Sequence, residues 1–418
     1  MLSDLNLKID NLGPINNADI KIGKINVIGG LNATGKSTAS KLLYCFLKGG
    51  TINRQEFAYS LIEPKLSRIV RMANRRVELE KFLMDDDYED FDMHQGSLLD
   101  QYKMIRNDIV HNNESSFSDS SFYSRIQDID KQIEVIEENG DKLYISLLQK
   151  LLFSEFDYRN LKGSVNFEGK FNNNYFKYSA NLISHQSNFS CSDFFLINDV
   201  IYVDSLSIFD FRKRRLNNHV SHLMDYIFIS EDDSLEFFNP ESYKKIIIVE
   251  DKIKDLLKGK FVIGKFGELK FISDDGYESQ IIDISSGMKQ IMVIQRLLSN
   301  QKLKENSFLI IDEPEVNLHP EWQIKLAEIF VLLAHELNIH IYINSHSPMF
   351  IEAMSIFSEY YNLQDETYFY LTEKIDNNGY YFKEIAFDNM GAVYENLAKP
   401  YNKLDYFKSK IAHNDLGD

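Results

Sequence analysis

Apolar and polar residues alternate along the first 28 residues of the chain, which is the pattern of strands with one buried face. A Gly-Pro pair at 13–14 predicts a turn in this region, and the apolar run at 25–28 predicts a buried strand. Residues 37–50 then have the apolar spacing of a helix and end in two glycines. The chain is therefore expected to begin with a hairpin, a buried strand and a helix.

The pattern changes between residue 51 and about residue 160, where apolar residues recur three and four positions apart among many charges. This spacing predicts a helical insertion. Short alternating segments at 162–203 predict strands, and a second helical stretch is expected at about 216–258. The remaining sequence predicts a hairpin, two apolar strands alternating with helices, and then a small hairpin with a terminal helix. Strands that alternate with helices are typical of an α/β fold.

The length of 418 residues exceeds the roughly 250–300 residues at which a single core stops growing, so we expect a large domain with an insertion, or two domains. No apolar run approaches the roughly 18 residues that span a bilayer. The first ten residues lack the features of a secretory signal, and Cys45 and Cys191 have no metal-ligand spacing. A cytoplasmic location is therefore expected.

The formal net charge of −17 argues against bulk binding to nucleic acid. Two basic segments, 65–81 and 211–215, leave local contact with nucleic acid open. For the first segment, the favoured interpretation is a solvated helix face of mixed charge.

Residues 30–37, "GLNATGKS", fit the phosphate-loop pattern G-x-x-x-x-G-K-[ST], and they stand between an apolar strand and a helix as the pattern requires. Backbone N–H groups of such a loop surround phosphate oxygens, and the helix N-terminus adds a favourable dipole. Lys36 is expected to contact the β- and γ-phosphates, and Ser37 to hold Mg²⁺. The candidate nucleotide-binding residues are Gly30, Asn32, Ala33, Thr34, Gly35, Lys36, Ser37 and Thr38.

Acidic residues follow the apolar strand predicted at 308–311, where ligands of open α/β sheets bind. We expect Asp312 to support Mg²⁺, and Glu313 to accept the proton of an attacking water molecule. The next predicted strand ends in "INSHSP", so His346 is a candidate for stabilising charge at the γ-phosphate.

The stretch "DISSGMKQ", residues 283–290, precedes an apolar helix. Ser285, Ser286 and Gly287 fit an ordinary helix cap, but a helix N-terminus with free N–H groups and a hydroxyl is also an anion site. The residues alone leave both interpretations open.

Together, "GLNATGKST", "ISSGMKQ", "IIDEPEVNLHPEWQ" and "INSHSP" resemble the ABC-type ATPase heads of SMC and double-strand-break-repair proteins. The subgroup that is most similar includes the overcoming-lysogenization-defect proteins and related ATPases of bacterial antiphage systems. The resemblance covers residues 1–48 and about 196–360. It implies an α/β P-loop ATPase head, built from 1–48 and 196–418, with a mainly helical insertion at 49–195.

The resemblance further implies a homodimer, or a higher oligomer, whose heads enclose two molecules of Mg-ATP and hydrolyse them slowly. Ser285 and Gly287 of one copy would then contact the γ-phosphate held by the other, with Ser286 in place of the family's first signature glycine. Residues 315–320 would link the two sites. Such a head would act as a switch or sensor in antiphage defence and control a separate effector such as a nuclease, because too little chain follows His346 for the nuclease domain of the family.

Two features fit the resemblance less simply. The family's glutamine loop has no counterpart, and Asp204 and Ser205 stand near its place. In the insertion, "RNDIVH" matches the R-N-x-x-x-H pattern of HEPN ribonucleases, in which Arg106 would hold phosphate and His111 would transfer protons. An ATP-gated ribonuclease toxin, a charged helix without such activity, and a DNA-maintenance ATPase head therefore remain alternatives.

Overall fold

The computed structural model describes fourteen stretches of the chain: residues 2–51, 62–83, 98–111, 120–138, 140–156, 162–171, 174–181, 186–191, 197–204, 218–228, 240–264, 267–375, 379–397 and 399–412. The chain forms two compact units. We call Met1–Thr51 with Leu148–Asp418 the head unit, and Ile52–Leu147 the insertion unit.

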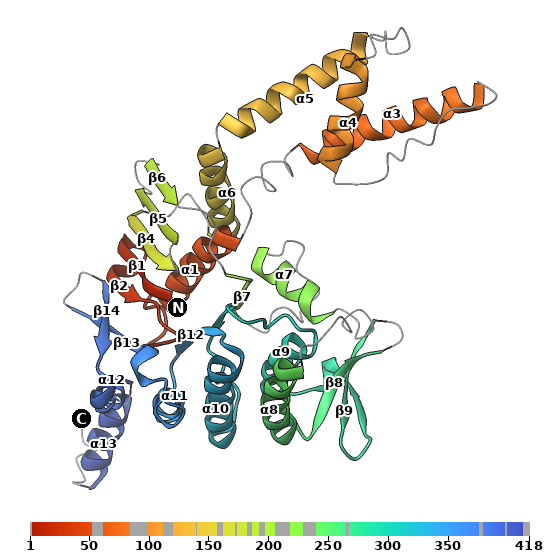
Figure 1. The fold of residues 1–418 in the computed structure, drawn as a ribbon. Helices are drawn as coiled ribbons and strands as arrows, with labels where there is room; N and C mark the ends of the chain where they lie inside the picture. Colours follow the sequence, from red (N-terminus) through yellow and green to blue (C-terminus); the bar gives the residue numbers. More distant parts are fainter. Residues whose placement is uncertain are drawn as a thin grey trace. The chain divides into compact units, whose positions relative to one another are not determined.

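An eleven-stranded sheet runs through the described part of the head unit (Figure 1). Its spatial order is β6-β5-β4-β1-β2-β14-β13-β3-β12-β11-β7. In chain order the strands are β1 (Leu2–Leu12), β2 (Ile15–Lys21), β3 (Ile25–Gly29), β4 (Ser164–Phe171), β5 (Asn174–Asn181), β6 (Gln186–Cys191), β7 (Val200–Val203), β11 (Phe308–Asp312), β12 (His340–Ser345), β13 (Thr367–Lys374) and β14 (Tyr380–Ile385). A separate three-stranded sheet contains β8 (Gly259–Ile263), β9 (Leu269–Ser273) and β10 (Glu278–Gln280).

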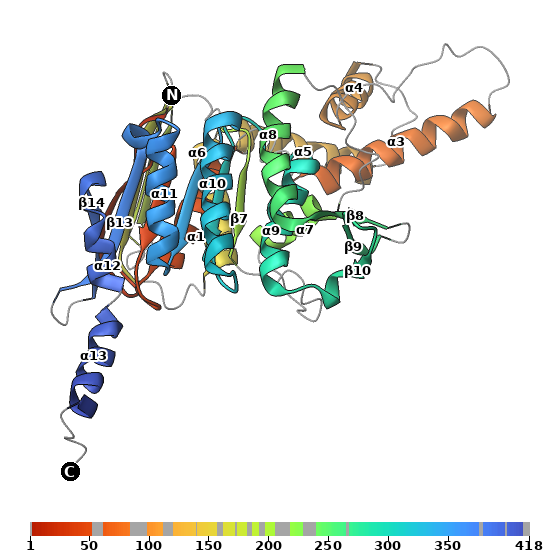
Figure 2. The ribbon, with the colours of Figure 1, turned by 90° about the horizontal axis from the view of Figure 1, so that it is seen from below.

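The described helices of the head unit include α1, which begins within the phosphate-loop motif, and α10 and α11, which lie beside the large sheet (Figure 2). They are α1 (Lys36–Thr51), α7 (Asn218–Ile227), α8 (Pro240–Leu257), α9 (Ser286–Ser299), α10 (Pro320–Leu337), α11 (Pro348–Tyr360), α12 (Gly391–Leu397) and α13 (Lys399–Ala412). Helix α6 (Gly140–Glu155) begins in the insertion unit and ends in the head unit. None of the helices in the described stretches combines the length and apolar character needed to cross a membrane.

The strand order determines where the candidate site residues meet. β12 pairs in parallel with β3 on one side and with β11 on the other. Parallel strands present their carboxyl ends at the same edge of a sheet. The phosphate loop after β3, the acidic pair Asp312 and Glu313 at the end of β11, and His346 after β12 therefore lie at one edge.

The two faces of this part of the sheet have different partners. Side chains at alternate positions, such as Val203, Ile311 and Ile343, lie in one core with residues of α8, α9, α10 and α11. The intervening positions carry Tyr202, Asp312 and Asn344 toward α1, where Ser40 contacts Asp312 and Asn344. The face toward α1 thus combines polar groups at the site with the buried rings of Tyr44 and Tyr202.

The α/β P-loop fold with a helical insertion after the first P-loop helix is confirmed. Three details differ from the sequence patterns. α1 continues through both glycines to Thr51. β13 and β14 pair as the small hairpin expected in the tail, and they also join the large sheet beside β3 and β2. Strands β4 to β6 fall within the predicted insertion range 49–195, but they extend the large sheet from β1, so the insertion unit ends before them.

The described helices of the insertion unit are α3 (Glu63–Leu83), α4 (Leu98–His111), α5 (Ser120–Glu138) and the first part of α6. They have their own apolar core, which includes Leu66, Ile105 and Ile126. The basic segment 65–81 lies within α3, whereas 211–215 lies outside the described residues. Local contact with nucleic acid stays a prediction for both.

Stacked aromatic rings join β4 to the helix of the phosphate loop. The ring centroids of Phe46 on α1 and Phe167 on β4 are 5.3 Å apart, and both side chains are buried. We expect Phe167→Ala to lower the free energy of unfolding by about 3–5 kcal/mol, because it leaves a cavity in a packed core. The exposed Tyr277→Ala is the control, with a change below about 0.5 kcal/mol in urea denaturation. Equal changes in the two variants would contradict the packing argument.

Candidate active site

The phosphate loop has a backbone that requires small residues. A Cβ atom added to Gly30 would lie 1.9 Å from Oγ1 of Thr372 on β13, so this strand excludes any larger residue. Gly35 has a φ of +100°, a conformation that favours glycine. Ala33 has a φ of 62° in the left-handed region, where a Cβ atom is disfavoured. The loop is held in a compact curve that ends at the N-terminus of α1.

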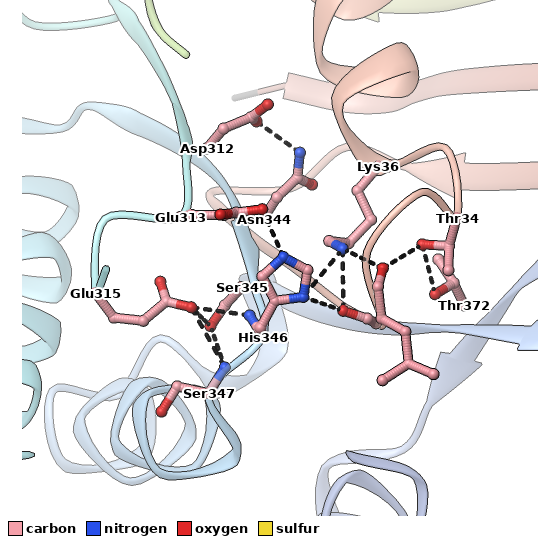
Figure 3. Close-up of polar contacts among 12 residues, drawn as sticks. Thr34, Lys36, Asp312, Glu313, Glu315, Asn344, Ser345, His346, Ser347 and Thr372 are labelled. Atoms are coloured by element: carbon pink, nitrogen blue, oxygen red, sulfur yellow. Dashed lines mark hydrogen bonds and ion pairs between the residues drawn. The ribbon is translucent and has the colours of Figure 1, made fainter. Parts of the chain in front are cut away.

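The ammonium group of Lys36 is buried and turned back onto its own loop (Figure 3). It donates to the backbone oxygens of Gly30, at 3.0 Å, and Leu31, at 2.7 Å. Burial lowers the pKa of Lys36 to about 8, while the carboxylates of Glu313, Asp312 and Glu315 act to raise it. An entering phosphate would offer this cation an anionic acceptor in place of two neutral carbonyls.

A chain of hydroxyl groups supports the loop from β13. Thr372 donates to Thr34 at 3.0 Å, and Thr34 donates to the backbone oxygen of Leu31 at 3.0 Å. The other predicted loop residues differ in exposure: Asn32, Ala33 and Ser37 are exposed, and Thr38 is half-buried. The exposed part of the loop is therefore the part that a ligand can reach.

Asp312 is buried at the end of β11 and accepts hydrogen bonds from several elements. Its donors are Ser40 on α1 at 3.0 Å, Tyr202 on β7 at 2.9 Å and Asn344 on β12 at 2.6 Å. Burial raises the pKa of Asp312, and hydrogen bonds from these residues and from Ser37 oppose the change. A hydroxyl beside a carboxylate is an oxygen donor set that suits Mg²⁺, so the residues present fit the ion implied by the motif.

Glu313 and His346 form a pair across the mouth of the loop. Nε2 of His346 lies 2.5 Å from Oε1 of Glu313, and Nδ1 lies 2.5 Å from the backbone oxygen of Gly30. A carbonyl oxygen only accepts, so Nδ1 donates its proton there. Glu313 itself has a φ of 54°, and its N–H donates to the backbone oxygen of Asn344 at 2.8 Å. The histidine therefore links the carboxylate of Glu313 to the loop. Its expected role in stabilising charge at the γ-phosphate stays a prediction.

Glu315 is a buried site residue that we did not predict individually. Its Oε1 accepts from the hydroxyl of Ser345 at 2.6 Å and from the N–H groups of His346 at 2.8 Å and Ser347 at 3.3 Å. Its Oε2 has no hydrogen-bond partner in the described part of the chain. The run of acids in "IDEPE" was the available signal. For Thr372, in the tail of the sequence, there was none.

Ser285 caps α9, as one of the two interpretations held. Its hydroxyl accepts from the N–H of Met288 at 3.3 Å, and both Ser285 and Ser286 are exposed. Gly287 is buried, and an added Cβ would lie 2.7 Å from the backbone oxygen of Asn317. The structure thus brings Lys36, Ser37, Asp312, Glu313 and His346 together, whereas the contacts described for the serines and glycine of α9 are with their own helix and residues 317–318.

Arg106 of the possible ribonuclease motif is paired within the insertion unit. Its Nε donates to Oδ2 of Asp130 on α5 at 2.8 Å, and the same carboxylate accepts from the hydroxyl of Tyr102 at 2.9 Å. The side chain of His111 lies outside the described residues. The ribonuclease alternative stays a prediction.

Comparison with known proteins gives a family match over most of the chain. Residues 25–352 match the model of the family described as "AAA domain, putative AbiEii toxin, Type IV TA system". This range begins at β3 and includes the phosphate loop, the insertion, the signature stretch (residues 283–290), the acidic pair and His346. No curated protein matches the chain.

Several solved structures resemble the chain weakly. The SMC head domain from Thermotoga maritima is 10% identical over 92% of this chain and 99% of its own, with a TM-score of 0.40. An SMC head from Pyrococcus furiosus, bound to the C-terminal domain of ScpA, is 10% identical over 95% and 100%, with a TM-score of 0.42. An ATP-binding cassette, in a dimeric post-hydrolysis state with ADP and phosphate, is 9% identical over 91% and 98%, with a TM-score of 0.34. These values are too low to transfer function.

Burial raises the pKa of Glu315, and the hydrogen bonds to it act in the opposite direction. A raised pKa means that the folded protein binds the proton more tightly than the unfolded chain, so this stabilisation is present at low pH and is lost as pH rises through the folded-state pKa. We expect Glu315→Gln, which keeps the acceptor oxygen without the charge, to retain wild-type stability or gain some at pH 7, and to lose that advantage at acid pH. Glu315→Ala should cost about 1–3 kcal/mol because buried donors lose their acceptor. Urea denaturation at both pH values measures this, and a Gln variant as unstable as Ala would contradict it.

Proposed function

We propose that this chain, which belongs to the family described as AAA domain, putative AbiEii toxin, Type IV TA system, binds Mg-ATP and hydrolyses it slowly as a P-loop ATPase of the SMC and ABC type. The observation that carries the proposal is the convergence of Lys36, Asp312, Glu313 and His346 at the carboxyl ends of three adjacent parallel strands. Phosphoryl transfer requires three kinds of group: a cation that binds phosphate, a carboxylate and hydroxyl that bind the metal, and a carboxylate that activates water.

Each side chain has a defined task in this proposal. The loop N–H groups and Lys36 bind the β- and γ-phosphates, and Ser37 with Asp312 would hold the metal. When bound, Mg²⁺ neutralises charge on the phosphates. Glu313 accepts a proton from the attacking water, and His346 keeps the carboxylate in place through the 2.5 Å contact. The catalysis expected from such a site is positioning and charge stabilisation.

We further propose that ATP joins two copies of the head, with Ser285 and Gly287 of one copy at the γ-phosphate held by the other. The exposure of Ser285 supports this, because a hydroxyl that accepts one hydrogen bond can still donate its own proton to a phosphate. Gly287 lies against Asn317, only four residues after Glu313. The segment 313–317 thereby connects the acidic pair of each copy to its residues 283–290. This segment is a route by which the two ATP sites of a dimer could be coupled.

The biological role that we propose is that of a switch or sensor in a bacterial defence system, which controls a separate effector such as a nuclease. The family description, which refers to a putative toxin of a toxin–antitoxin system, supports a defence role in general. The same description favours a second candidate, in which this chain is itself the toxic component. Growth arrest on expression of the chain alone, lost with Lys36→Ala, would favour this second candidate over the switch.

Glu313→Gln tests the proposed chemistry. The amide keeps the size of the side chain but cannot accept the proton, so we expect ATP to bind normally and turnover to fall by at least ~100-fold, the usual contribution of a general base. An ATP-bound dimer should accumulate, as measured by light scattering with equilibrium nucleotide binding. Lys36→Ala is the matched variant, because it should lose binding itself while keeping the fold. Wild-type turnover in Glu313→Gln would exclude it as the base, and unchanged ATP affinity in Lys36→Ala would refute the phosphate-loop assignment.

Mixing two inactive variants tests the contact between copies. Ser285→Arg should bind ATP as a monomer but fail to dimerise and hydrolyse, whereas loss of a cap alone, in Ser285→Ala, costs about 1 kcal/mol of stability. A mixture of Lys36→Ala and Ser285→Arg chains should regain ATPase activity, because each heterodimer has one site with an intact loop and an intact signature. Heterodimers that form without any activity would count against the arrangement, as would full activity of Ser285→Arg alone.

A further inference from the structure

A second carboxylate lies beside Asp312 at the edge of the sheet. β7 pairs in parallel with β11, and Val203 stands opposite Ile311, so Asp204 and Asp312 are the next positions along the two strands. Side chains two residues apart share a face, and the hydroxyl of Tyr202 on that face donates to Asp312. Burial raises the pKa of Tyr202, and the carboxylates of Asp312 and Asp204 add to the change, which agrees with both acids lying near its hydroxyl.

His219 lies between Asp204 and a second acid, Glu155. The side chains of His219, in the first turn of α7, and of Glu155, the last residue of α6, are fully buried. Nδ1 of His219 lies 2.6 Å from Oε2 of Glu155, and Nε2 lies 3.2 Å from Oδ2 of Asp204. The side chain of Asp204 is 25% exposed, so it is the member of the trio that reaches the surface of the site.

The surroundings of His219 leave its ring little freedom. Its centroid is 4.7 Å from that of Tyr202 and 5.9 Å from that of Tyr44 on α1. Nδ1 meets hydrogen-bond geometry with Glu155, whereas Nε2 contacts Asp204 at an ion-pair distance only. Burial acts to lower the pKa of His219, but Asp204 and Glu155 raise it above its ordinary value. The ring therefore has a fixed orientation between two acids, of which Asp204 is the more exposed.

Resting on the proposed ATPase function, we propose that Glu155 and His219 are positioning residues that hold Asp204 beside Asp312, where its carboxylate supports the hydration shell of the magnesium ion. Mg²⁺ keeps several of its water molecules in proteins, and carboxylates around those waters contribute to its affinity. The trio also gives α6, through which the chain returns from the insertion unit, a direct contact with a residue at the site.

Nucleotide binding with and without Mg²⁺ tests the proposal on the full chain. The readout is the affinity for a fluorescent ATP analogue, titrated with Mg²⁺, so it does not depend on turnover. Asp204→Asn and His219→Gln should keep the affinity measured without Mg²⁺. Both should raise the Mg²⁺ concentration that gives half of the metal-dependent gain by about 10-fold or more, as expected for residues that support metal binding indirectly.

His222→Gln is the matched control. It lies on the same helix as His219, and its Nε2 is 3.7 Å from Oδ2 of Asp199, which precedes β7 at the opposite end of the strand. This variant should keep the Mg²⁺ dependence of the wild type, because its acid partner is remote from the carboxyl ends of the strands. A purely structural role for α7 histidines would instead affect both variants alike.

The outcomes separate this inference from the function it rests on. Wild-type Mg²⁺ dependence in Asp204→Asn would overturn the role of Asp204, and an equal loss in His222→Gln would overturn the positioning role of His219. If His219→Gln does not fold, as judged by its thermal transition, Asp204→Asn decides alone, because Asn keeps the shape of the side chain. A wild-type chain that binds no nucleotide would refute the ATPase itself.

Discussion

The buried carboxylate of Asp312 is the interaction on which the site depends. Side chains from α1, β7 and β12 all donate to it, namely Ser40, Tyr202 and Asn344. A polar group this deep in a protein is costly unless its oxygens are hydrogen-bonded. The three donors offset that cost, and in doing so they hold the phosphate-loop helix against the carboxyl ends of two strands. The same residue that suits a metal ion is thus also the link between the parts of the sheet and α1.

The phosphate loop is shaped by a neighbour that lies far away in the sequence. Thr372 on β13 supports Thr34 and leaves no room for a side chain at Gly30, while His346, which directly follows β12, contacts the carbonyl of Gly30. A loop fixed from two strands enters binding with little conformational entropy to lose. Lys36, which bonds to the loop carbonyls, needs only to exchange acceptors.

Residues of the signature stretch have a structural role within their own chain and a proposed role in binding the phosphate of a second copy. Gly287 is required by its close approach to the backbone of Asn317, and Ser285 is accounted for as the N-cap of α9. Neither role excludes contact with a phosphate from a second copy, because the hydroxyl of Ser285 is exposed and its proton is not used by the cap. Packing therefore explains why Gly287 is small, and capping explains why Ser285 is polar.

The sequence by itself determined the local features: the phosphate loop between a strand and a helix, the acids that follow β11, the cap of α9 and the helical character of the insertion. These depend on neighbours within a few residues, where spacing and periodicity carry the information. Only the tertiary structure placed β12 between β3 and β11, joined β4 to β1, and brought Thr372 to the loop and His219 between Glu155 and Asp204. Such contacts follow from strand order and helix packing between distant segments, and no pattern along a single sequence specifies which strands become neighbours.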